Sequence, residues 1–587
     1  MTRALLLTAD ILAGVAAVMI GVALPPARLS SAATPRDGAI AGVIHVHTNR
    51  SDGLSSPDDI AAMAARAGLQ FVVFTDHGDG TRRPDRPQYR SGVLCVDAVE
   101  ISTSGGHVVA LGLPETPYPF AGDPREVLED VHRLGGFAIA AHPDSPKSDL
   151  MWRDWDLPID GVELVNLDTA WRKHLPQGGW RPTVHLLASL GTYLVRPAET
   201  IASLLGDDQV LLSAWHGIAH RRRASIFAGV DAHARLELRD SAPGDNRLSL
   251  SLPGYEAVFR TLTMHVRPER PLVGDAEADA RLVLDALERG ASFAVVDAIF
   301  GPPAFEFSAT VGGTTVEPGD RAKTTGPASL TVQTNAPPTF TTTIWRNGEV
   351  LASQSTQPNV TLDGVAGPAV YQVAIRATDR PAAPIWLMSN PIYVGGAPAE
   401  TPSSNNRSEQ SGAVSRSGAA PAADTRRPRV LLDAVTQAVW RTEVASASKA
   451  AVDLVTEASL RELRVRYGLP GGDAFGQFAA AVVETPGGVA PHDRLVFTAR
   501  AERPMRLSIQ VRALVGLDQT RRWQRTIYVD DAVSTHTLLF DSFTPVEEGI
   551  ASRPPAGNVL AILFIVDRTH TKPGASGRFW LRDVSLR

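Results

Sequence analysis

Cysteine is almost absent from this chain of 587 residues, which contains only Cys95. A single cysteine cannot close a disulfide within the chain, and it cannot supply a cluster of thiolate metal ligands. Cys95 lies in the apolar stretch GVLCVDAVE, where we expect a small core residue rather than a nucleophile. Disulfide staples and thiolate metal clusters are therefore excluded.

An excess of positive charge is absent as well. Lysine and arginine number 57 against 63 aspartates and glutamates, which gives a formal net charge of −6. Nucleic acids and anionic membranes attract basic surfaces, so we expect neither a nucleic-acid partner nor a nuclease activity. The hydrophobic content of 44% is ordinary for a globular protein, and the length predicts two to four domains.

The apolar run near the N-terminus, Ile11 to Leu24, falls short of the roughly 20 residues of a membrane span. It suits the core of a signal peptide, and Ser30-Ser31-Ala32 offers small residues for cleavage. We predict that residues 1–32 are a cleaved signal peptide, or an uncleaved anchor with Asp10 near the membrane interface. Both alternatives place the remainder outside the cytoplasm (periplasmic, secreted or anchored facing outward) and confine membrane contact to this segment.

Between residues 40 and 298, short apolar runs alternate with segments of helical pattern. The first helix is predicted in SPDDIAAMAARAGL, where Ser56 caps the helix, Pro57 begins it and Gly68 ends it. Similar helical segments precede the apolar runs FAIAAHPD and ASIFAGVDAH. Strand–helix alternation of this kind predicts an α/β fold with parallel strands, in an open doubly wound sheet or a closed barrel.

Past Gly301 the pattern becomes all-β. Residues 301–395 alternate polar and apolar side chains around the turn signal RNGE (346–349), and they predict a small β-sandwich. Residues 396–428 have almost no large apolar side chains and predict a flexible linker. Residues 429–587 predict a second β-sandwich, whose closing strand GRFWLRDVSLR resembles that of galactose-binding-like, carbohydrate-associated domains. This resemblance implies contact with carbohydrate or a cell surface; the alternative is a structural spacer.

Histidines and carboxylates recur where the predicted strands end. In AGVIHVHTNRSDG (41–53), His45 and His47 are two residues apart, so both side chains should project from one face of an extended strand. Asp231 and His233 have the same spacing in GVDAH. Because the carboxyl ends of parallel strands share one rim, we expect these side chains to meet there. The predicted metal ligands are His45, His47, Asp52, His77, Glu100, His107, His142, Asp231 and His233.

Imidazole and carboxylate ligands without thiolate favour Zn²⁺, Mn²⁺ or Fe²⁺. Nine ligands are too many for one ion, so the sequence predicts two or three divalent metal ions as cofactors. A water that bridges two such ions has its pKa lowered to about 7, which supplies a hydroxide nucleophile at neutral pH. The same ions can hold the oxygens of a phosphoryl group.

The motifs HVHTNRSDG, TDH, VEIS followed by GGHVVALG, AHPD and GVDAH resemble those of the PHP (polymerase and histidinol phosphatase) family of metallohydrolases, over residues 40–298. The resemblance extends to its exported, carbaryl-hydrolase-like branch. It implies a distorted seven-stranded β/α barrel, here followed by the two sandwiches. Val230 stands where the family often has serine. The resemblance implies a first ion held by His45, His47 and Asp231, a second by His107 and His142 with Glu100 bridging the two, and a third by Asp52, His77 and His233.

We therefore predict a metal-dependent hydrolase, a phosphoesterase acting on a small-molecule ester. One alternative is a carboxylic or carbamate ester or amide hydrolase with the same metal site, because a hydroxide attacks a carbonyl equally well. An alternative of another class is a surface carbohydrate-binding protein that acts through its C-terminal sandwich.

Several polar residues near these motifs have two interpretations each. Asp76 could orient the neighbouring imidazole of His77 or cap a turn. Asn166, in GVELVN, could touch substrate or support a ligand, and Glu163 is the weaker candidate of that strand. Three basic residues in predicted loops could bind a phosphate oxygen, although such residues are usually solvated. They are Arg153, Arg172 and Lys173.

Overall fold

The computed structural model of the protein describes most of the chain in two compact units. The units comprise Met1–Pro114 with Asp123–Ser411, and Glu115–Gly122 with Gly412–Arg587. The predicted leader (1–32) and linker (396–428) lie largely outside the described residues. Within those residues, no helix has the length and apolar character that crossing a membrane requires. The described residues are 21, 23–31, 38–174, 188–206, 209–237, 249–250, 252–323, 326–355, 359–365, 368–380, 383–395, 427–432, 440–445, 447–457, 460–472, 476–547 and 549–587.

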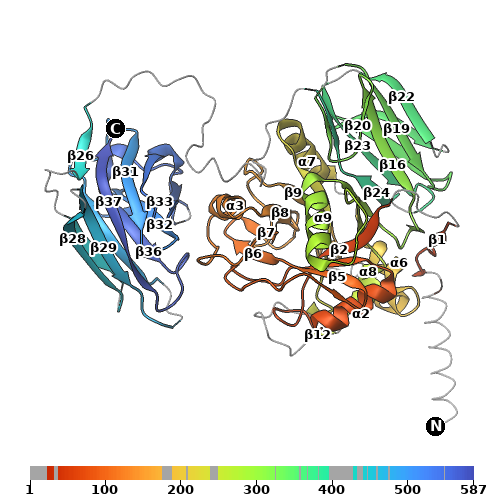
Figure 1. The fold of residues 1–587 in the computed structure, drawn as a ribbon, viewed down its shortest axis with the longest axis horizontal. Coiled ribbons are helices and arrows are strands. Elements are labelled where there is room, and N and C mark those ends of the chain that lie inside the picture. Colours follow the sequence, from red (N-terminus) through yellow and green to blue (C-terminus); the bar gives the residue numbers. More distant parts are fainter. Residues whose placement is uncertain are drawn as a thin grey trace, which may run out of the picture. The chain divides into compact units, whose positions relative to one another are not determined.

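The first unit is built around a sheet whose strands close into a ring (Figure 1). Most neighbours in the ring run parallel, as the strand–helix alternation predicts, but β6–β7 and β7–β8 are antiparallel. An isolated bridge between His77 and Glu100 joins β6 to the segment that follows β3. In ring order the strands are β2 (Ile40–Val46), β3 (Phe71–Phe74), β5 (Val93–Asp97) with β6 (Val99–Thr103), β7 (Gly106–Leu111), β8 (Phe137–Ala141), β9 (Gly161–Asn166) and β10 (Ser225–Ala232), which pairs with β2.

Helices lie on the outside of this sheet. The helix predicted after Ser56 is confirmed as α2 (Pro57–Ala67): the Ser56 hydroxyl accepts a hydrogen bond from the amide of Asp59, and Gly68 ends the helix at φ 83°. Its buried face, which includes Ile60 and Ala64, packs on β3 and β5. The other helices of this unit are α3 (Pro124–Arg133), α4 (Leu167–Arg172), α6 (Pro197–Ala202), α7 (Gln209–Arg221), α8 (Tyr255–Phe259) and α9 (Ala276–Arg289).

The all-β region after residue 300 is not a separate core. Its strands form two layers, and one layer continues the main sheet because β14 pairs with β24. Phe305, Phe307 and Trp386 share one apolar cluster with Val43 and Ile44 of β2. The boundary predicted near residue 300 therefore lies inside one compact unit.

The strands of this region confirm the hairpin that RNGE predicts: β20 and β21 pair across Asn347 (φ 53°) and Gly348 (φ 85°). β13 (Thr263–Val266) pairs with β2 and with β14 (Ser292–Val295), and so extends the main sheet. The layer that continues this sheet contains β18 (Arg321–Ala322), β20 (Thr341–Arg346), β21 (Glu349–Ser355), β23 (Ala369–Arg376), β24 (Ile385–Ser389) and β25 (Ile392–Val394). The other layer contains β16 (Phe305–Val311), β17 (Thr314–Val316), β19 (Ala328–Thr334) and β22 (Asn359–Val365). Shorter strands of this unit are β1 (Leu29–Ser30), β4 (Gln88–Arg90), β11 (Leu236–Glu237), β12 (Ser249–Leu250) and β15 (Phe300–Gly301).

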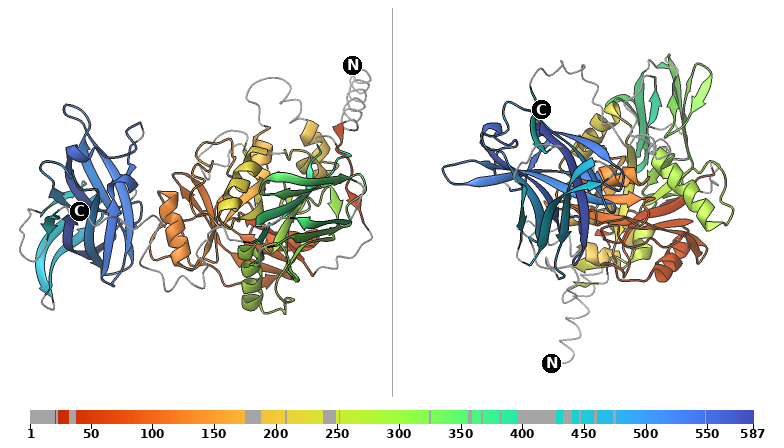
Figure 2. Two further views of the ribbon diagram at one scale, coloured as in Figure 1. Left: turned by 90° about the horizontal axis from the view of Figure 1, so that it is seen from above. Right: turned by 60° about the vertical axis from the view of Figure 1, so that its left-hand side comes forward.

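The second unit is a β-sandwich, as residues 429–587 predict (Figures 1 and 2). Side chains from its two sheets meet in one apolar core, where the rings of Phe497 and Phe564 pack edge to face at 5.1 Å. One sheet contains β26 (Arg429–Leu432), β28 (Lys449–Glu457), β29 (Leu460–Gly468), β31 (Arg494–Ala501), β34 (Ser534–Leu539) and β37 (Ser576–Leu586). The other contains β27 (Trp440–Val444), β30 (Phe478–Glu484), β32 (Met505–Leu514), β33 (Thr520–Val529), β35 (Thr544–Pro545) and β36 (Val559–Asp567).

Asp297, beyond β14, yields a stability prediction for the first unit. Burial raises the pKa of its carboxyl to about 6, although the hydroxyl of Thr263 donates a hydrogen bond to it. A carboxyl whose pKa is raised on folding favours the protonated form, so stability falls as the pH rises from about 4 through 6. We expect Asp297→Asn to stabilise the protein by about 1–2 kcal/mol at pH 8 and to have no effect at pH 4. Thermal unfolding midpoints at both pH values check this, and equal shifts at the two would contradict it.

Candidate metal site

The nine ligands predicted from the sequence all gather at one end of the closed sheet. They form four overlapping groups, and within each group the candidate ligand atoms lie within 4.8 Å of one another. Residues nearly 190 positions apart in the chain thus become neighbours. The groups are His45, His47 and Asp231; His45, Glu100 and His142; His77, Glu100 and His107; and His47, Asp52, His77 and His233.

At the centre of the cluster, two imidazole nitrogens face two carboxylate oxygens. The Nε2 atoms of His45 and His47 lie 3.2–3.3 Å from Glu100 Oε2, and both lie 3.3 Å from Asp231 Oδ1. Both nitrogens are buried, and neither has a hydrogen-bond partner in the described part of the chain. A buried polar atom without a partner is costly, whereas two nitrogens and two carboxylate oxygens converging on one point suit a divalent cation. The residues present therefore fit a metal ion.

The Glu100 carboxylate connects this centre to a second group. Its other oxygen, Oε1, lies 2.7 Å from Nδ1 of His107 and 2.8 Å from Nε2 of His142. Glu100 is 1% exposed, so its charge is balanced inside the protein. Its two oxygens therefore face two different pairs of imidazole nitrogens.

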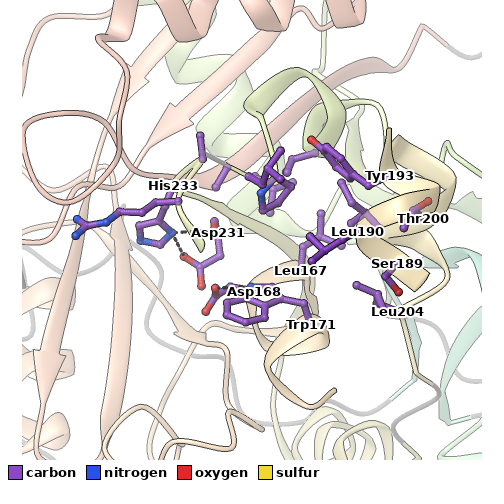
Figure 3. Close-up of a pocket in the computed structure, with 18 residues that line it drawn as sticks. Leu167, Asp168, Trp171, Ser189, Leu190, Tyr193, Thr200, Leu204, Asp231 and His233 are labelled. Carbon is purple, nitrogen blue, oxygen red and sulfur yellow. Dashed lines mark hydrogen bonds and ion pairs between the residues drawn. The ribbon is translucent and has the colours of Figure 1, made fainter. Parts of the chain in front are cut away.

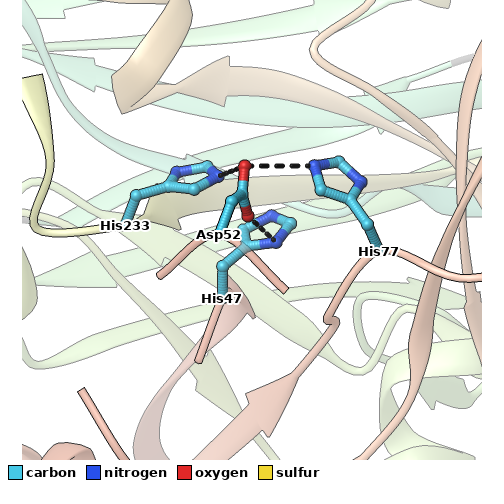
Figure 4. A group of neighbouring side chains, drawn as sticks. All are labelled: His47, Asp52, His77 and His233. Atoms are coloured by element: carbon cyan, nitrogen blue, oxygen red, sulfur yellow. Dashed lines mark ion pairs between the residues drawn. The ribbon is translucent and has the colours of Figure 1, made fainter. Parts of the chain in front are cut away.

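A third group lies on the open side of the cluster (Figure 4). Asp52 Oδ2 is 3.4 Å from Nε2 of His233 and 3.6 Å from Nε2 of His77, while Oδ1 is 3.4 Å from Nδ1 of His47. The side chains of His77 and Asp52 are 36% and 30% exposed, whereas those of His45 and His47 are fully buried. Solvent therefore reaches the cluster from this side.

The backbone departs from regular strand geometry at the site. His45 (φ 64°), His142 (φ 30°) and Asp231 (φ 47°) adopt left-handed conformations, which cost of order 1–3 kcal/mol each in residues other than glycine. The pairings of β2 and β10 shift register at the first and last of these positions. His45 and His47 do converge as the sequence predicts, but β2 is kinked between them and the strand alternation is not regular there.

His107 reaches the rim of the sheet by a different route from the other predicted ligands. Not every ligand follows the carboxyl end of a parallel strand, because His107 is the second residue of β7. Since β7 runs antiparallel to both β6 and β8, its beginning lies at the rim where β8 ends. The tight turn at Gly105–Gly106 places His107 opposite Ser102, close to Glu100.

The electrostatics of the cluster follow from its density of charge. Burial lowers the pKa of His45, but the surrounding carboxylates, Asp231 foremost, raise it well above its ordinary value. Burial also lowers the pKa of His142, and Glu100 outweighs this to raise it to about 9. Conversely, burial raises the pKa of Glu100, yet the imidazoles around it, with His77 foremost, hold it well below its usual range. The carboxylates remain charged and attract positive charge.

Glu163 is the residue that the sequence analysis ranked too low. It is fully buried, and its Oε1 lies 2.7 Å from Nδ1 of His45. Its Oε2 accepts hydrogen bonds from the backbone amide of His142 (2.8 Å) and from the side-chain amide of Asn166 (2.9 Å). A carboxylate on Nδ1 of a histidine keeps the proton there and leaves Nε2 free to bind a metal. The signal that could have indicated this role is a glutamate within the apolar strand GVELVN.

Asp76 and Asn166 have positioning roles. The Asp76 carboxylate accepts hydrogen bonds from the amide and hydroxyl of Thr48 (both 2.8 Å) and from the hydroxyl of Ser51 (2.6 Å), so it holds the turn that leads to Asp52. Of the two interpretations of Asp76, these contacts favour the turn. Asn166 caps α4, accepting from the amide of Thr169, and its side-chain amide reaches Glu163.

The three basic residues predicted to bind a phosphate oxygen are engaged elsewhere. Arg153 donates to the carbonyl of Ser148. Arg172 pairs with Asp168, and Lys173 pairs with Asp144. These contacts are to a carbonyl and to carboxylates outside the nine-residue cluster.

The fold and the site together define an α/β protein with a closed sheet, a β-sandwich unit and a buried histidine–carboxylate cluster that could hold metal ions. No family model matches the chain. An uncharacterized protein of Methanocaldococcus jannaschii is 33% identical over 137 residues, which cover 21% of this chain and 80% of that protein. The chain belongs to the family of this archaeal protein.

Some solved structures show a weak likeness. A family 11 carbohydrate-binding module from Clostridium thermocellum, in complex with a mixed-linked tetrasaccharide, is 15% identical with a TM-score of 0.24, covering 27% of this chain and 94% of that chain. A family 30 module of a Clostridium thermocellum cellulase is 9% identical with a TM-score of 0.22, covering 28% and 98%. TM-scores this low say nothing about what the present chain binds.

The contact between Glu163 and His45 generates the first prediction for the site. We expect Glu163→Gln to lower affinity for Zn²⁺ or Mn²⁺ about 10- to 100-fold, because the amide no longer fixes the His45 ring through a charged hydrogen bond. Competition with a chromophoric chelator measures this affinity. Glu256→Gln, which alters a surface pair with Arg66, is the matched control and should leave the affinity unchanged.

Gly229 lies against the Glu163 carboxylate and gives the second prediction. A Cβ on Gly229 would lie 2.0 Å from Glu163 Oε1, so Gly229→Ala must push the carboxylate off His45. We expect metal affinity to fall at least as far as in Glu163→Gln, and the unfolding midpoint to fall as well. Gly217→Ala, in α7, meets nothing within 4 Å and should bind metal normally. Wild-type affinity in Gly229→Ala would show that the carboxylate is dispensable.

Proposed function

We propose that this chain is a metal-dependent hydrolase of the PHP type and that it cleaves a phosphate ester. The observation that carries the proposal is the central arrangement, in which Nε2 of His45 and of His47 face Glu100 and Asp231 without hydrogen-bond partners. The closed α/β sheet with its functional rim agrees with the barrel that the PHP resemblance implies.

Three groups of residues would hold the ions. The central one is His45, His47 and Asp231, with Glu100 shared with His107 and His142; the open one is Asp52, His77 and His233. Bound divalent ions would supply Lewis acidity, lower the pKa of a coordinated water and stabilise charge that develops on a phosphoryl group. Adjacent groups suit a phosphate ester, which presents several oxygens at once.

The remaining roles belong to side chains of the protein itself. Glu163 keeps a proton on Nδ1 of His45, so that Nε2 stays directed into the cluster. Asp76 fixes the turn at residues 48–51, which places Asp52 at the opening. The hydroxyl of Tyr255 donates to the carbonyl of His47 (2.8 Å) and holds the same loop from the other side. The ester approaches past His77 and Asp52, where the cluster is exposed.

The rival activity, hydrolysis of a carboxylic or carbamate ester or amide, would use the same residues. Among the described residues of 429–587 the aromatic side chains are buried or half-buried, and they give a carbohydrate-binding role no specific support. Carbohydrate contact and export through the N-terminal segment stay predictions from the sequence.

The experiment is a hydrolysis panel on the full chain loaded with Zn²⁺ or Mn²⁺. We expect phosphate release from small phosphomonoesters, with kcat/KM lowered at least about 100-fold in His142→Ala because a ligand of the cluster is lost. His220→Ala, at an exposed position of α7, is the matched control and should retain full activity. Carboxyl esters are assayed beside the phosphates; turnover of these alone would establish the rival, and inactivity on both with metal bound would reject the proposal.

A further inference from the structure

An apolar pocket adjoins the metal-site cluster. Most of the 18 residues that line it are apolar (Figure 3). They come from α4, from α6 and β10 with the residues that follow each, from α8, and from the segments 189–193 and 252–253. Asp231 and His233, two residues of the cluster, lie at one end, while Leu190 and Leu204 lie toward the other. The pocket thus extends from the candidate metal site into an apolar compartment.

Three polar side chains in the wall of this pocket already form hydrogen bonds with neighbouring residues. Nε1 of Trp171 donates to Asp168 (2.9 Å), the hydroxyl of Tyr193 accepts from the amide of Gly254 (2.9 Å), and the hydroxyl of Thr200 donates to Thr192 (3.1 Å). These side chains therefore form their hydrogen bonds within the protein. Ring faces and methyl groups make up most of the surface that lines the pocket. A ligand group that enters here gains binding free energy by burying apolar surface rather than by forming hydrogen bonds.

We infer that this pocket binds an alkyl or aryl group of the ester, so that the substrate class is an amphiphilic phosphate ester. The inference rests on the proposed function, and it adds that the phosphoryl group lies on the cluster while the hydrophobic alcohol portion lies among Leu167, Leu190 and Leu204. Because Asp231 and His233 belong to both the pocket and the cluster, one molecule can occupy both at once.

A series of n-alkyl phosphates tests the inference on the full chain. From ethyl to hexyl phosphate the reactivity of the leaving group hardly changes, so a rise in kcat/KM reports burial of the chain. Each methylene that enters the pocket is worth about fourfold, and we expect at least a tenfold rise across the series. Equal kcat/KM for ethyl and hexyl phosphate would overturn the inference while leaving the hydrolase proposal intact.

A matched pair of variants tests whether the rise in kcat/KM comes from this pocket. Leu190 lines the pocket, whereas Leu194, four residues later, is 81% exposed and does not. We expect Leu190→Asn to reduce the hexyl-to-ethyl ratio of kcat/KM at least fivefold, because it places an amide in the wall, and Leu194→Asn to leave the ratio unchanged. An equal loss in both variants would overturn the assignment of the pocket.

Binding is measured separately from turnover with n-hexylphosphonate and ethylphosphonate, which cannot be hydrolysed at the ester position. Trp171 fluorescence reports occupancy, with Trp171→Phe as the blank for the other tryptophans. We expect the hexyl compound to bind at least tenfold more tightly, and Leu190→Asn to remove that preference. Preferential binding with no turnover of any phosphate would support the pocket and reject the phosphoesterase, so the two failures are distinguishable.

Discussion

The accumulation of negative charge in a buried space is the constraint on which the site depends. Glu100 and Asp231 lie in the interior, directed at the same two imidazole nitrogens. Buried carboxylates are tolerated only where positive charge balances them, and here six histidines surround them. The low pKa of Glu100 and the raised pKa of His45 express that balance. A bound divalent cation would supply the same compensation without protonation of the imidazoles.

Glu163 connects this electrostatic centre to the fold. It lies on β9, contacts His45 on β2, accepts from the amide of His142 after β8, and fits only because Gly229 on β10 lacks a side chain. One carboxylate on β9 thus contacts β2, β10 and the residue that follows β8. The left-handed conformations in β2 and β10 are maintained by this surrounding structure, which offsets their local cost.

The two sides of the cluster have different characters. Toward His77 and Asp52 it is open and polar, and toward Leu190 and Leu204 it continues into an apolar pocket. Asp231 and His233 belong to both environments. The proposed substrate, an ester with one charged end and one hydrophobic end, would match this asymmetry.

The identity of the clustered residues was readable from the sequence, because histidine and carboxylate stand out against apolar strands and recur close to the strand termini. Local elements such as α2 and the Asn347–Gly348 hairpin were predictable for a similar reason: caps and turns depend on neighbouring residues. The C-terminal sandwich also followed from strand alternation.

Only the tertiary structure decided how the ligands converge. The kink at His45, the antiparallel course of β7 that brings His107 to the rim, and the burial of Glu163 beneath Gly229 all depend on pairing between strands distant in sequence. The same holds for the continuation of the main sheet through β24 and for the apolar pocket. The periodicity of a segment indicates which of its faces is apolar, but not which distant strand the segment pairs with. The pairing between distant strands sets the geometry of the site.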